Sequence, residues 1–344
     1  MRLKPGTIYF VRETDRDTGK YSDLVKIGLV ESPRTARQRL SEHQTGNPRK
    51  LDLDNQSVDT DAVGYVEAQL HKAFASKRVL GEWFHFQNES EIAEAVAKAR
   101  ELAVVAASRT PVFAKAEELA GFYSEGNSIP STTQTLKALA DYSMNARALA
   151  EYQTLANQIK SVLETTLAEQ GAEALEGIYK VIPKFYEPSF SVTKFRKDYG
   201  KSHADLIAKC EVKIPKFVES FEWLLEDMEP DLADNVKTNI ARLAKEIDAA
   251  IVKDDFFALN DLLLQINEEI APLEWEIAYL EAEVKQACGT APGIDGVCSW
   301  VREIKETKKF EPAILADLDP EMYRSGFVTK EPSEIKIFLG YKSK

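Results

Sequence analysis

Apolar positions in the first ninety residues follow a period of two in short stretches, as expected for β-strands. Residues 7–11 are β-branched and aromatic, and residues 24–29 repeat this composition after a charged loop. Leu51 and Leu53 alternate with aspartates, which predicts a short third strand. Residues 82–86 are a further aromatic segment that we expect to return to the sheet. The pattern therefore predicts a small three-stranded sheet.

Two stretches with helical periodicity accompany this sheet. The first covers residues 33–44, with Ser32 as N-cap and a proline at the first helical position. A Gly-Asn-Pro sequence at residues 46–48 is expected to end it. The second covers about residues 61–76, and its apolar side chains share one face. Residues 1–90 are thus predicted to form an α+β domain.

The rest of the chain is mostly helical in its pattern. Residues 88–123 predict two Ala-rich helices interrupted by Pro111, and residues 131–171 predict one long amphipathic helix. From Leu259 to Val284 apolar residues step by four and three, which is the spacing of a coiled-coil seam. A second apolar stripe precedes this seam, so we expect an intramolecular antiparallel hairpin. A dimer through the same seam is the alternative.

Two near copies of one short sequence lie in the middle of the chain. Residues 179–185 and 211–217 both end in Ile-Pro-Lys-Phe, and residues 191–209 between them have a helical pattern. We interpret them as two strand-like arms joined by a helix, although a chance repeat explains the likeness equally well. A last apolar run, residues 335–340, predicts an edge strand.

A chain of 344 residues is too long for one ordinary core, which agrees with several domains. The expected fold is α+β: a small N-terminal domain followed by a mostly helical region with a coiled-coil hairpin. The predicted segments are the α+β domain at 1–90, a helical region at 91–175, a mixed α/β segment at 176–220, acidic coiled-coil helices at 221–288 and a tail at 289–344.

Composition excludes several classes of protein. No run of about 18 apolar residues occurs, so no membrane span is expected, and the first residues lack the apolar segment of a secretory signal. Cys210, Cys288 and Cys298 form no CxxC pair, which favours reduced thiols in a cytoplasmic protein. A disulfide between Cys288 and Cys298 is a minor alternative. We find no P-loop, zinc-binding quartet or nucleophile elbow.

The net charge of −12 is unevenly distributed. Residues 1–90 hold 14 Lys/Arg against 13 Asp/Glu, whereas residues 220–290 hold 5 against 17. A uniformly acidic surface would repel nucleic acid, but this chain has a near-neutral N-terminal part and one acidic helical block. The basic side chains of the N-terminal part surround the two predicted helices and suggest a track for a DNA backbone, at even odds with an ordinary solvated surface. These side chains are Arg34, Arg37, Arg49, Lys50, Lys72, Lys77 and Arg78.

Several polar residues of the N-terminal region exceed what its apolar pattern needs. Taken singly, each has an ordinary explanation: a strand tyrosine, an edge lysine whose stem lies on apolar surface, a solvated arginine, or a surface Glu–His pair four residues apart. None alone justifies a chemical assignment. These residues are Tyr9, Lys26, Arg39, His43, Glu67, His71 and Glu82.

In combination and order, however, they resemble the motifs of the GIY-YIG nuclease superfamily. Residues 7–9 stand for the first motif, with Thr7 where the family has Gly. Residues 26–28, Lys-Ile-Gly, stand for the second motif, with Lys26 in place of Tyr. These two departures slightly favour a protein that has kept the fold without the activity.

Later motifs retain more of the family pattern. Arg39-Leu40 followed by Gln44-Thr45-Gly46-Asn47-Pro48 is similar to the arginine-bearing helix and its exit. Glu67 with Leu70-His71 is similar to the next helix of the family. Over residues 5–90 the chain most resembles the phage-type subgroup with a Lys-Ile-Gly second motif and a Gly-Glu-Trp-Phe signature, here residues 81–84.

The resemblance implies a divalent-metal-dependent DNA endonuclease. Glu67 is the one carboxylate of the pattern placed to bind a hard cation, Mg²⁺ or Mn²⁺, so a single ion is expected rather than a two-metal clamp. Arg39 offers a fixed, charged fork for the scissile phosphate. Tyr9 is implied to be a general base or water-orienting group. Since the usual pKa of tyrosine is about 10, it would need a cationic neighbour, and we expect Lys26 to be that neighbour.

The remaining polar residues have supporting roles in this interpretation. His43 and His71 are candidates for contacting phosphate or transferring a proton, and Glu82 for supporting the site from behind. The superfamily acts in restriction, defence, homing and repair, and resemblance favours a phage or mobile-element setting.

Two other interpretations stay open. The fold could serve nucleic-acid binding without catalysis, while the helical region acts as a scaffold through a protein partner or homo-oligomer. The acidic helices at residues 220–290 could also cover the basic face of the N-terminal domain and restrain cleavage, since their charges are opposite.

Overall fold

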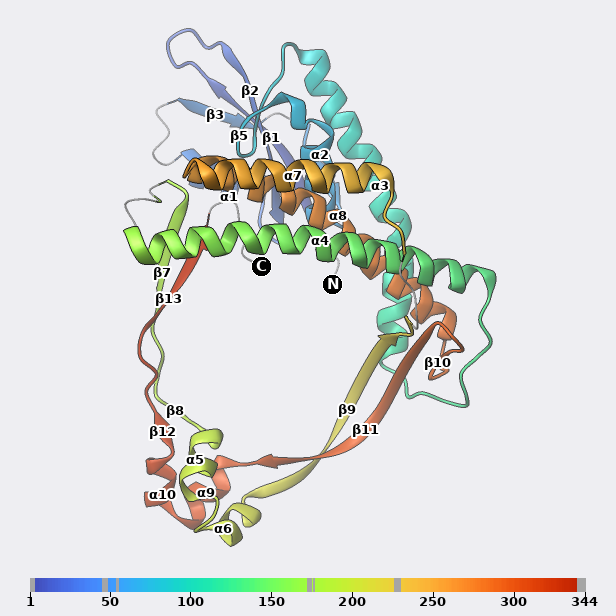
Figure 1. Ribbon diagram of the computed structural model, residues 1–344, viewed down its shortest axis with the longest axis vertical. Helices are drawn as coiled ribbons and strands as arrows, with labels where there is room; N and C mark the ends of the chain where they lie inside the picture. The colour runs from blue at the N-terminus through green and yellow to red at the C-terminus, as the bar shows by residue number, and fades with distance from the viewer. Residues whose placement is uncertain are drawn as a thin grey trace.

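The structure is a computed structural model that describes residues 4–44, 49–53, 56–171, 175, 177–225 and 230–338. It has the predicted α+β class: an N-terminal antiparallel sheet with flanking helices precedes a mostly helical region. Figure 1 shows a layer of long helices below the sheet, and a small module joined to that layer by two β-ribbons.

The central strands of the N-terminal sheet are long and β-branched. β1 (Gly6–Thr14) and β2 (Tyr21–Glu31) pair antiparallel, with Tyr9 opposite Gly28. The sheet order is β3-β1-β2-β6-β5, and β4 also pairs with β1. It therefore has six strands rather than the predicted three, because strands of three residues are too short to give a clear alternation. The outer strands are β3 (Lys50–Leu53), β4 (Val58–Thr60), β5 (Arg78–Leu80) and β6 (Trp83–His85).

Helix α1 (Ala36–Gln44) lies on one face of this sheet. It begins three residues later than predicted, because its cap is Thr35 and not Ser32. The Gln38 amide donates to Thr35 Oγ1 at 3.3 Å, and the Thr35 amide donates to Gln38 Oε1 at 2.8 Å. Such a reciprocal pair satisfies two amides that a helix start leaves open. The predicted stop at residues 46–48 lies outside the described residues.

The opposite face of the sheet packs against α2 (Val63–Ala73) and α3 (Glu89–Ala120). A short 3₁₀ turn, η1 (Ala75–Lys77), follows α2. The α3 helix runs through Pro111, where the sequence predicted an interruption. It continues because buried side chains on both sides of the proline, among them Ala106 and Ala116, pack it against its neighbours.

Three long helices form the next layer: α4 (Thr133–Gln170), α7 (Asp234–Val252) and α8 (Phe256–Cys288). The α7–α8 pair forms the predicted hairpin, and α4 packs against both helices in a shared apolar core. α8 also reaches the first domain, where Trp275 stacks on Tyr65 with ring centroids 4.0 Å apart. Among the described residues, none of the helices is both long enough and apolar enough to span a membrane.

The predicted mixed segment contributes half of a second, smaller module, and the C-terminal segment contributes the other half. The module has its own apolar core around Phe195, Ile207 and Phe310. Its elements are β8 (Ser189–Phe190), α5 (Val192–Tyr199), α6 (Ala204–Lys209), α9 (Pro312–Leu318), α10 (Pro320–Ser325) and β12 (Phe327–Val328). We call these elements the distal module.

Two antiparallel ribbons connect the distal module to the helical layer. One pairs β7 (Tyr179–Lys184) with β13 (Ser333–Phe338), the predicted edge strand; the other pairs β9 (Glu211–Trp223) with β11 (Cys298–Phe310). A short strand, β10 (Gly293–Ile294), extends the second ribbon. In Figure 1 the ribbons leave opposite ends of the layer and converge on the module, so the backbone encloses an open ring.

The two cysteines considered for a disulfide lie close together but are free. Cys288 Sγ and Cys298 Sγ are 3.7 Å apart, and both thiols are buried where α8 meets β11. Cys210 is likewise free and buried, in the distal module.

Candidate active site

The face of the sheet covered by α1 carries the predicted tyrosine. Tyr9 is 1% exposed, and its ring lies over Gly28 of the neighbouring strand. A Cβ atom at position 28 would approach Tyr9 Oη to 2.6 Å. The glycine of the Lys-Ile-Gly motif therefore makes room for the phenol, and this close approach accounts for its presence in the strand.

Helix α1 brings His43 and Arg39 to this phenol. His43 Nε2 lies 3.3 Å from Tyr9 Oη. Arg39 acts on Tyr9 through its charge and a hydrogen bond. Arg39 and His43 are four residues apart on α1, so one turn of the helix presents both side chains to one strand residue.

Burial decides the ionisation of Tyr9. Desolvation, and then the negative charge of Glu82, raise the pKa of Tyr9 to about 12, although Arg39 acts to lower it. A phenol with this pKa is protonated at neutral pH, so in this arrangement it donates a proton rather than accepting one. The pKa of His43 is lowered instead, chiefly by desolvation and by the charges of Lys26 and Arg39. His43 is therefore neutral at pH 7.

The sequence suggested Lys26 as the cationic neighbour of Tyr9, and the structure shows its ion-pair partner. Its Nζ forms an ion pair with Glu82 Oε2 at 2.6 Å, and the cation that acts on Tyr9 is Arg39. Lys26 and Glu82 meet because β2 pairs with β6, which follows Glu82 directly. Lys26 contributes its charge to the environment of His43.

Arg39 has an acidic partner that sequence reasoning missed. Arg39 Nη1 donates to Glu42 Oε2 at 2.8 Å, and Arg34 also bonds Glu42. This pairing raises the pKa of Arg39 and lowers that of Glu42. The spacing of three residues on one helix was the signal that could have revealed Glu42. Because 41% of the Arg39 side chain is exposed, its guanidinium can still reach a phosphate.

The predicted metal ligand lies on α2. Glu67 is 1% exposed, and its charge contributes to raising the pKa of Tyr9. A carboxylate removed from water is costly unless charges or hydrogen bonds compensate it, so the burial of Glu67 implies polar partners. In the described ranges no three His, Cys, Asp or Glu side chains converge into a multi-ligand metal site.

His71 faces the interface with α8. Its Nε2 lies 2.9 Å from the Ile27 carbonyl, and its Nδ1 lies 3.2 Å from Glu268 Oε1. Arg78 bonds the same carboxylate oxygen at 2.5 Å. His71 thus links the strand that carries Lys26 to the helical layer. Glu268 is 197 residues away in sequence, and no local pattern could have identified it.

Most of the predicted DNA track is paired with acidic side chains. Six of its seven residues form ion pairs within the described chain, and Arg37 is the exception. Two of these pairs, Lys72–Glu269 and Arg78–Glu268, connect to α8. Helix α8 therefore contacts two basic residues of the predicted DNA track, Lys72 on α2 and Arg78 just after it.

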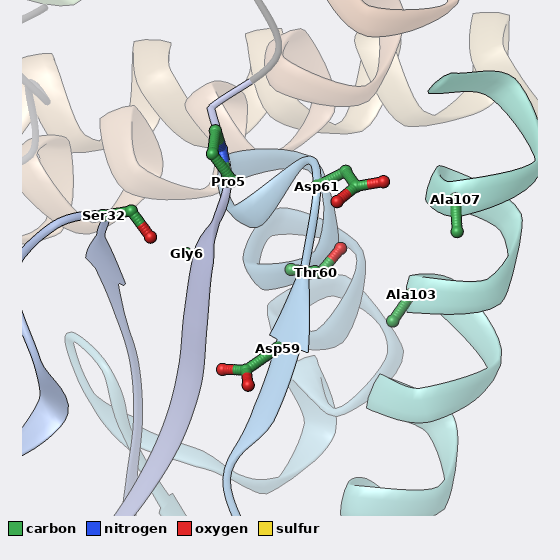
Figure 2. Close-up of a pocket in the computed structure, with 8 residues that line it drawn as sticks. All are labelled: Pro5, Gly6, Ser32, Asp59, Thr60, Asp61, Ala103 and Ala107. Carbon is green, nitrogen blue, oxygen red and sulfur yellow. The ribbon is translucent and has the colours of Figure 1, made fainter. Parts of the chain in front are cut away.

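The departure at Thr7 has a structural explanation. Thr7 Oγ1 donates to Asp59 Oδ1 at 2.6 Å, which ties β1 to β4. Asp59 also lines a cavity of about 350 Å³ between the N-terminal strands and α3, shown in Figure 2. None of the predicted catalytic residues borders this cavity. Thr7 therefore joins β1 to β4 and does not belong to the cluster around Tyr9.

Comparison with known proteins agrees with a nuclease-like N-terminal domain. Residues 6–100 match the family model of the T5orf172 domain, a phage-associated domain of the nuclease type. The match includes Tyr9, Lys26, Arg39 and Glu67, and it extends into α3 beyond the boundary predicted at residue 90. No curated protein and no solved structure matches the chain.

Proposed function

We propose that the N-terminal domain is a DNA endonuclease of the GIY-YIG type, acting in a phage or mobile-element setting with one divalent cation. The observation that carries this proposal is the meeting of Tyr9, Arg39 and His43 on one face of a domain that matches a nuclease-type family. The buried carboxylate Glu67, whose charge acts on the same phenol, supports it.

The donor set fits a single hard cation. Glu67 would hold it through its carboxylate, and water would complete its coordination shell. Bound there, Mg²⁺ or Mn²⁺ would stabilise negative charge on the phosphate and on the leaving oxygen. Glu82 is already neutralised by Lys26, so a two-metal clamp is not supported.

The side chains around Tyr9 can activate water. Neutral His43 with its proton on Nδ1 accepts at Nε2, where Tyr9 Oη donates. Tyr9 can pass its proton to His43 as it takes one from the attacking water. The resulting hydroxide forms the new bond to phosphorus, the bond to the leaving oxygen breaks, and solvent protonates that oxygen. Arg39 positions the phosphate and offsets its charge.

Cleavage of plasmid DNA with Mg²⁺ tests this proposal. Because Glu67 is the proposed ligand, we expect Glu67→Gln to lower the cleavage rate at least about 100-fold. Glu31→Gln is the matched control, since Glu31 lies in the same domain but pairs with Lys4 at an exposed site. It should cleave like the wild type.

A measurement without cleavage separates metal binding from folding. Mn²⁺ should raise the melting temperature of the wild type and of Glu31→Gln, but not that of Glu67→Gln. Equal cleavage by wild type and Glu67→Gln would rule out the proposed role of Glu67. Folded wild type that never cleaves DNA would favour the alternative, a nucleic-acid-binding or scaffold protein.

A further inference from the structure

The distal module and its ribbons carry both paired and unpaired cations, and Arg196, Lys213, Lys305, Lys308 and Lys309 have acidic partners. Six lysines on these elements are exposed and form no ion pair within the described residues, in contrast to most of the basic residues around α1 and α2. They are Lys184, Lys194, Lys197, Lys201, Lys209 and Lys216. This difference is unexpected in a chain whose net charge is −12.

Helix α5 presents several of these cations together. Phe195 is buried in the module core, and Tyr199 packs against it. Lys194 and Lys197 are exposed on α5, and Lys201 follows in the next turn, at spacings of three and four residues. The inner face of α5 therefore packs into the module core, while Lys194 and Lys197 are exposed on the same helix as one exposed acid, Asp198.

The Ile-Pro-Lys-Phe repeat supplies the lysines of the two ribbons. One copy leads out of β7 and the other lies in β9, so each ribbon carries one copy. Lys184 stands beside Phe185, which is 77% exposed, and Lys216 beside Phe217, which is 38% exposed. Since successive side chains of a strand point to opposite faces, Lys216 and Phe217 offer a cation on one face of the β9–β11 ribbon and an exposed ring on the other.

The β9–β11 ribbon is a long two-stranded ribbon whose apolar side chains are partly exposed rather than buried in a core. It has only two strands along most of its length, and Phe217 and Ile304, opposite each other, are both partly exposed. A two-stranded ribbon of this kind fits the major groove of B-DNA. Its 13 residues span roughly 40 Å, more than one helical turn of a duplex.

The register of this ribbon also favours an anionic partner. Lys216 lies opposite Lys305, and Lys213 lies opposite Lys308. Like charges directly across an antiparallel pair are destabilising, and phosphates between them would offset the repulsion. Lys213, Lys305 and Lys308 have acidic neighbours, whereas Lys216 has none within the described chain.

We propose that the two ribbons and the distal module hold a DNA duplex through its phosphate backbone. This inference rests on the proposed nuclease function, to which it adds the part that grips the substrate. Figure 1 places the distal module on the far side of the helical layer from the N-terminal sheet. Substrate holding and cleavage are thereby assigned to different parts of the molecule.

Binding at different salt concentrations tests the proposal in the full-length protein. Fluorescence anisotropy with a labelled 40-base-pair duplex in EDTA measures affinity while cleavage is suppressed. Each phosphate contact contributes about 0.9 to the slope of log K against log salt concentration. We expect Lys194→Gln/Lys197→Gln/Lys201→Gln to reduce that slope by about 1 to 3 and to weaken binding at low salt by about tenfold or more.

The matched control removes the same charge elsewhere. Lys137, Lys245 and Lys253 are also exposed and without an ion pair within the described residues, but they lie on and beside α4 and α7. Their triple Gln variant should keep the wild-type slope. A second variant, Lys184→Gln/Lys216→Gln, tests the ribbons and should lower the slope by about 1 to 2. Thermal unfolding verifies that each variant is folded.

The outcomes distinguish this inference from the nuclease proposal. A reduced slope in the module variant with an unchanged slope in the control supports the inference, whether or not the protein cleaves DNA. Equal slopes in all proteins, or a wild type that does not bind duplex, would overturn it. A module variant that only turns a dimer into a monomer by light scattering would also overturn it, because the lysines would then contact the acidic helices of a second copy.

Discussion

At the scale of single residues, the ionisation of the site is set by burial more than by neighbouring charge. Tyr9 is held protonated by desolvation and by Glu82, while the cation that opposes them, Arg39, is shared with Glu42. His43 is held neutral by the same surroundings. The pair therefore suits a relay in which the phenol moves a proton and the imidazole stores it.

This relay predicts the dependence of cleavage on pH. Because the pKa of His43 is lowered from 6.5, the wild type should keep its activity below pH 6.5 and lose it as falling pH protonates His43. His43→Gln should be slower by about 100-fold, and its rate should lack this loss at low pH. Cleavage rates between pH 5 and 8 at saturating Mn²⁺ measure both.

His85→Gln is the control for the pH profile, since His85 is exposed at the end of β6. It should retain the wild-type curve. If His43→Gln still lost cleavage activity at low pH as the wild type does, the group whose protonation stops cleavage would not be His43.

The close contact between Tyr9 and Gly28 predicts an effect of one methyl group. Gly28→Ala would place Cβ within 2.6 Å of Tyr9 Oη, so the phenol must move away from His43. We expect a loss of about 1–3 kcal/mol in stability and a larger relative loss of cleavage. Gly64→Ala on α2, where a Cβ meets nothing within 4 Å, should be neutral or stabilising by up to about 1 kcal/mol. Melting temperature and cleavage rate are measured for both variants. A cleavage rate that falls only as far as the folded fraction does would indicate a purely structural effect.

At the scale of elements, α8 joins two cores that the sequence suggests are separate. Near its middle Trp275 stacks on Tyr65 of the first domain, and Arg109 lies 4.4 Å from the Trp275 ring. Toward its start, Leu259 and Leu263 fill the core shared with α4 and α7. The nuclease-like domain and the helical layer should therefore unfold together.

Truncating this aromatic contact tests that coupling. Trp275→Ala should cost about 3–5 kcal/mol, because it removes a buried ring and its stacking. Phe257→Ala on the same helix should cost far less, since Phe257 is 63% exposed. Urea unfolding followed by both far-UV circular dichroism and tryptophan fluorescence measures the cost. Two separate transitions in the wild type would contradict a single cooperative unit.

Local patterns predicted the elements well and their pairing poorly. The strands around Tyr9 and Lys26, the long helix α4 and the α7–α8 hairpin follow from periodicity. The sheet has more strands than predicted because β4 to β6 are three residues long, and α3 survives Pro111 because tertiary packing outweighs a local breaker. The partners of the two arms could not be predicted, because they lie in the C-terminal segment.

The same distinction holds for the candidate site. Family resemblance named Tyr9, Arg39 and His43, and the structure brings them together. It could not predict that Lys26 would be paired with Glu82, because that pair depends on a strand contact across 56 residues. Contacts between residues close in sequence produce a recognisable spacing, whereas contacts between distant strands produce no spacing that can be read from the sequence.

At the scale of the whole molecule, acidic side chains of α8 form ion pairs with two basic residues on and just after α2, Lys72 and Arg78. Glu269 on α8 holds Lys72 at 2.6 Å. This contact suits the hypothesis that the helical layer competes with DNA. Deleting residues 220–290 is a poor test, because α7 and α8 fill the core that they share with α4. Replacing one glutamate of α8 at a time tests the hypothesis without removing that core.

Glu269→Gln should free Lys72 for a phosphate. If the helical layer competes with DNA, we expect the slope of log K against log salt concentration to increase by about 0.9, and stability to change by less than about 1 kcal/mol. Glu246→Gln, whose partner Arg242 lies on the same helix, is the control and should leave the slope unchanged. Equal slopes for both variants would show that the acidic layer does not restrain DNA binding through Lys72.

The pairing of the ribbons has a consequence for the order in which the protein is made. The chain enters the distal module through β7 and leaves through β9, but it returns through β11 and leaves again through β13. The β9–β11 ribbon cannot pair before residues 298–310 have left the ribosome, nor the β7–β13 ribbon before residues 333–338, whereas the strands and helices around Tyr9 emerge first. A nascent chain can therefore bring Tyr9, Arg39 and His43 together before either ribbon has paired, and the grip on DNA that we assign to the ribbons and the distal module forms after that candidate site.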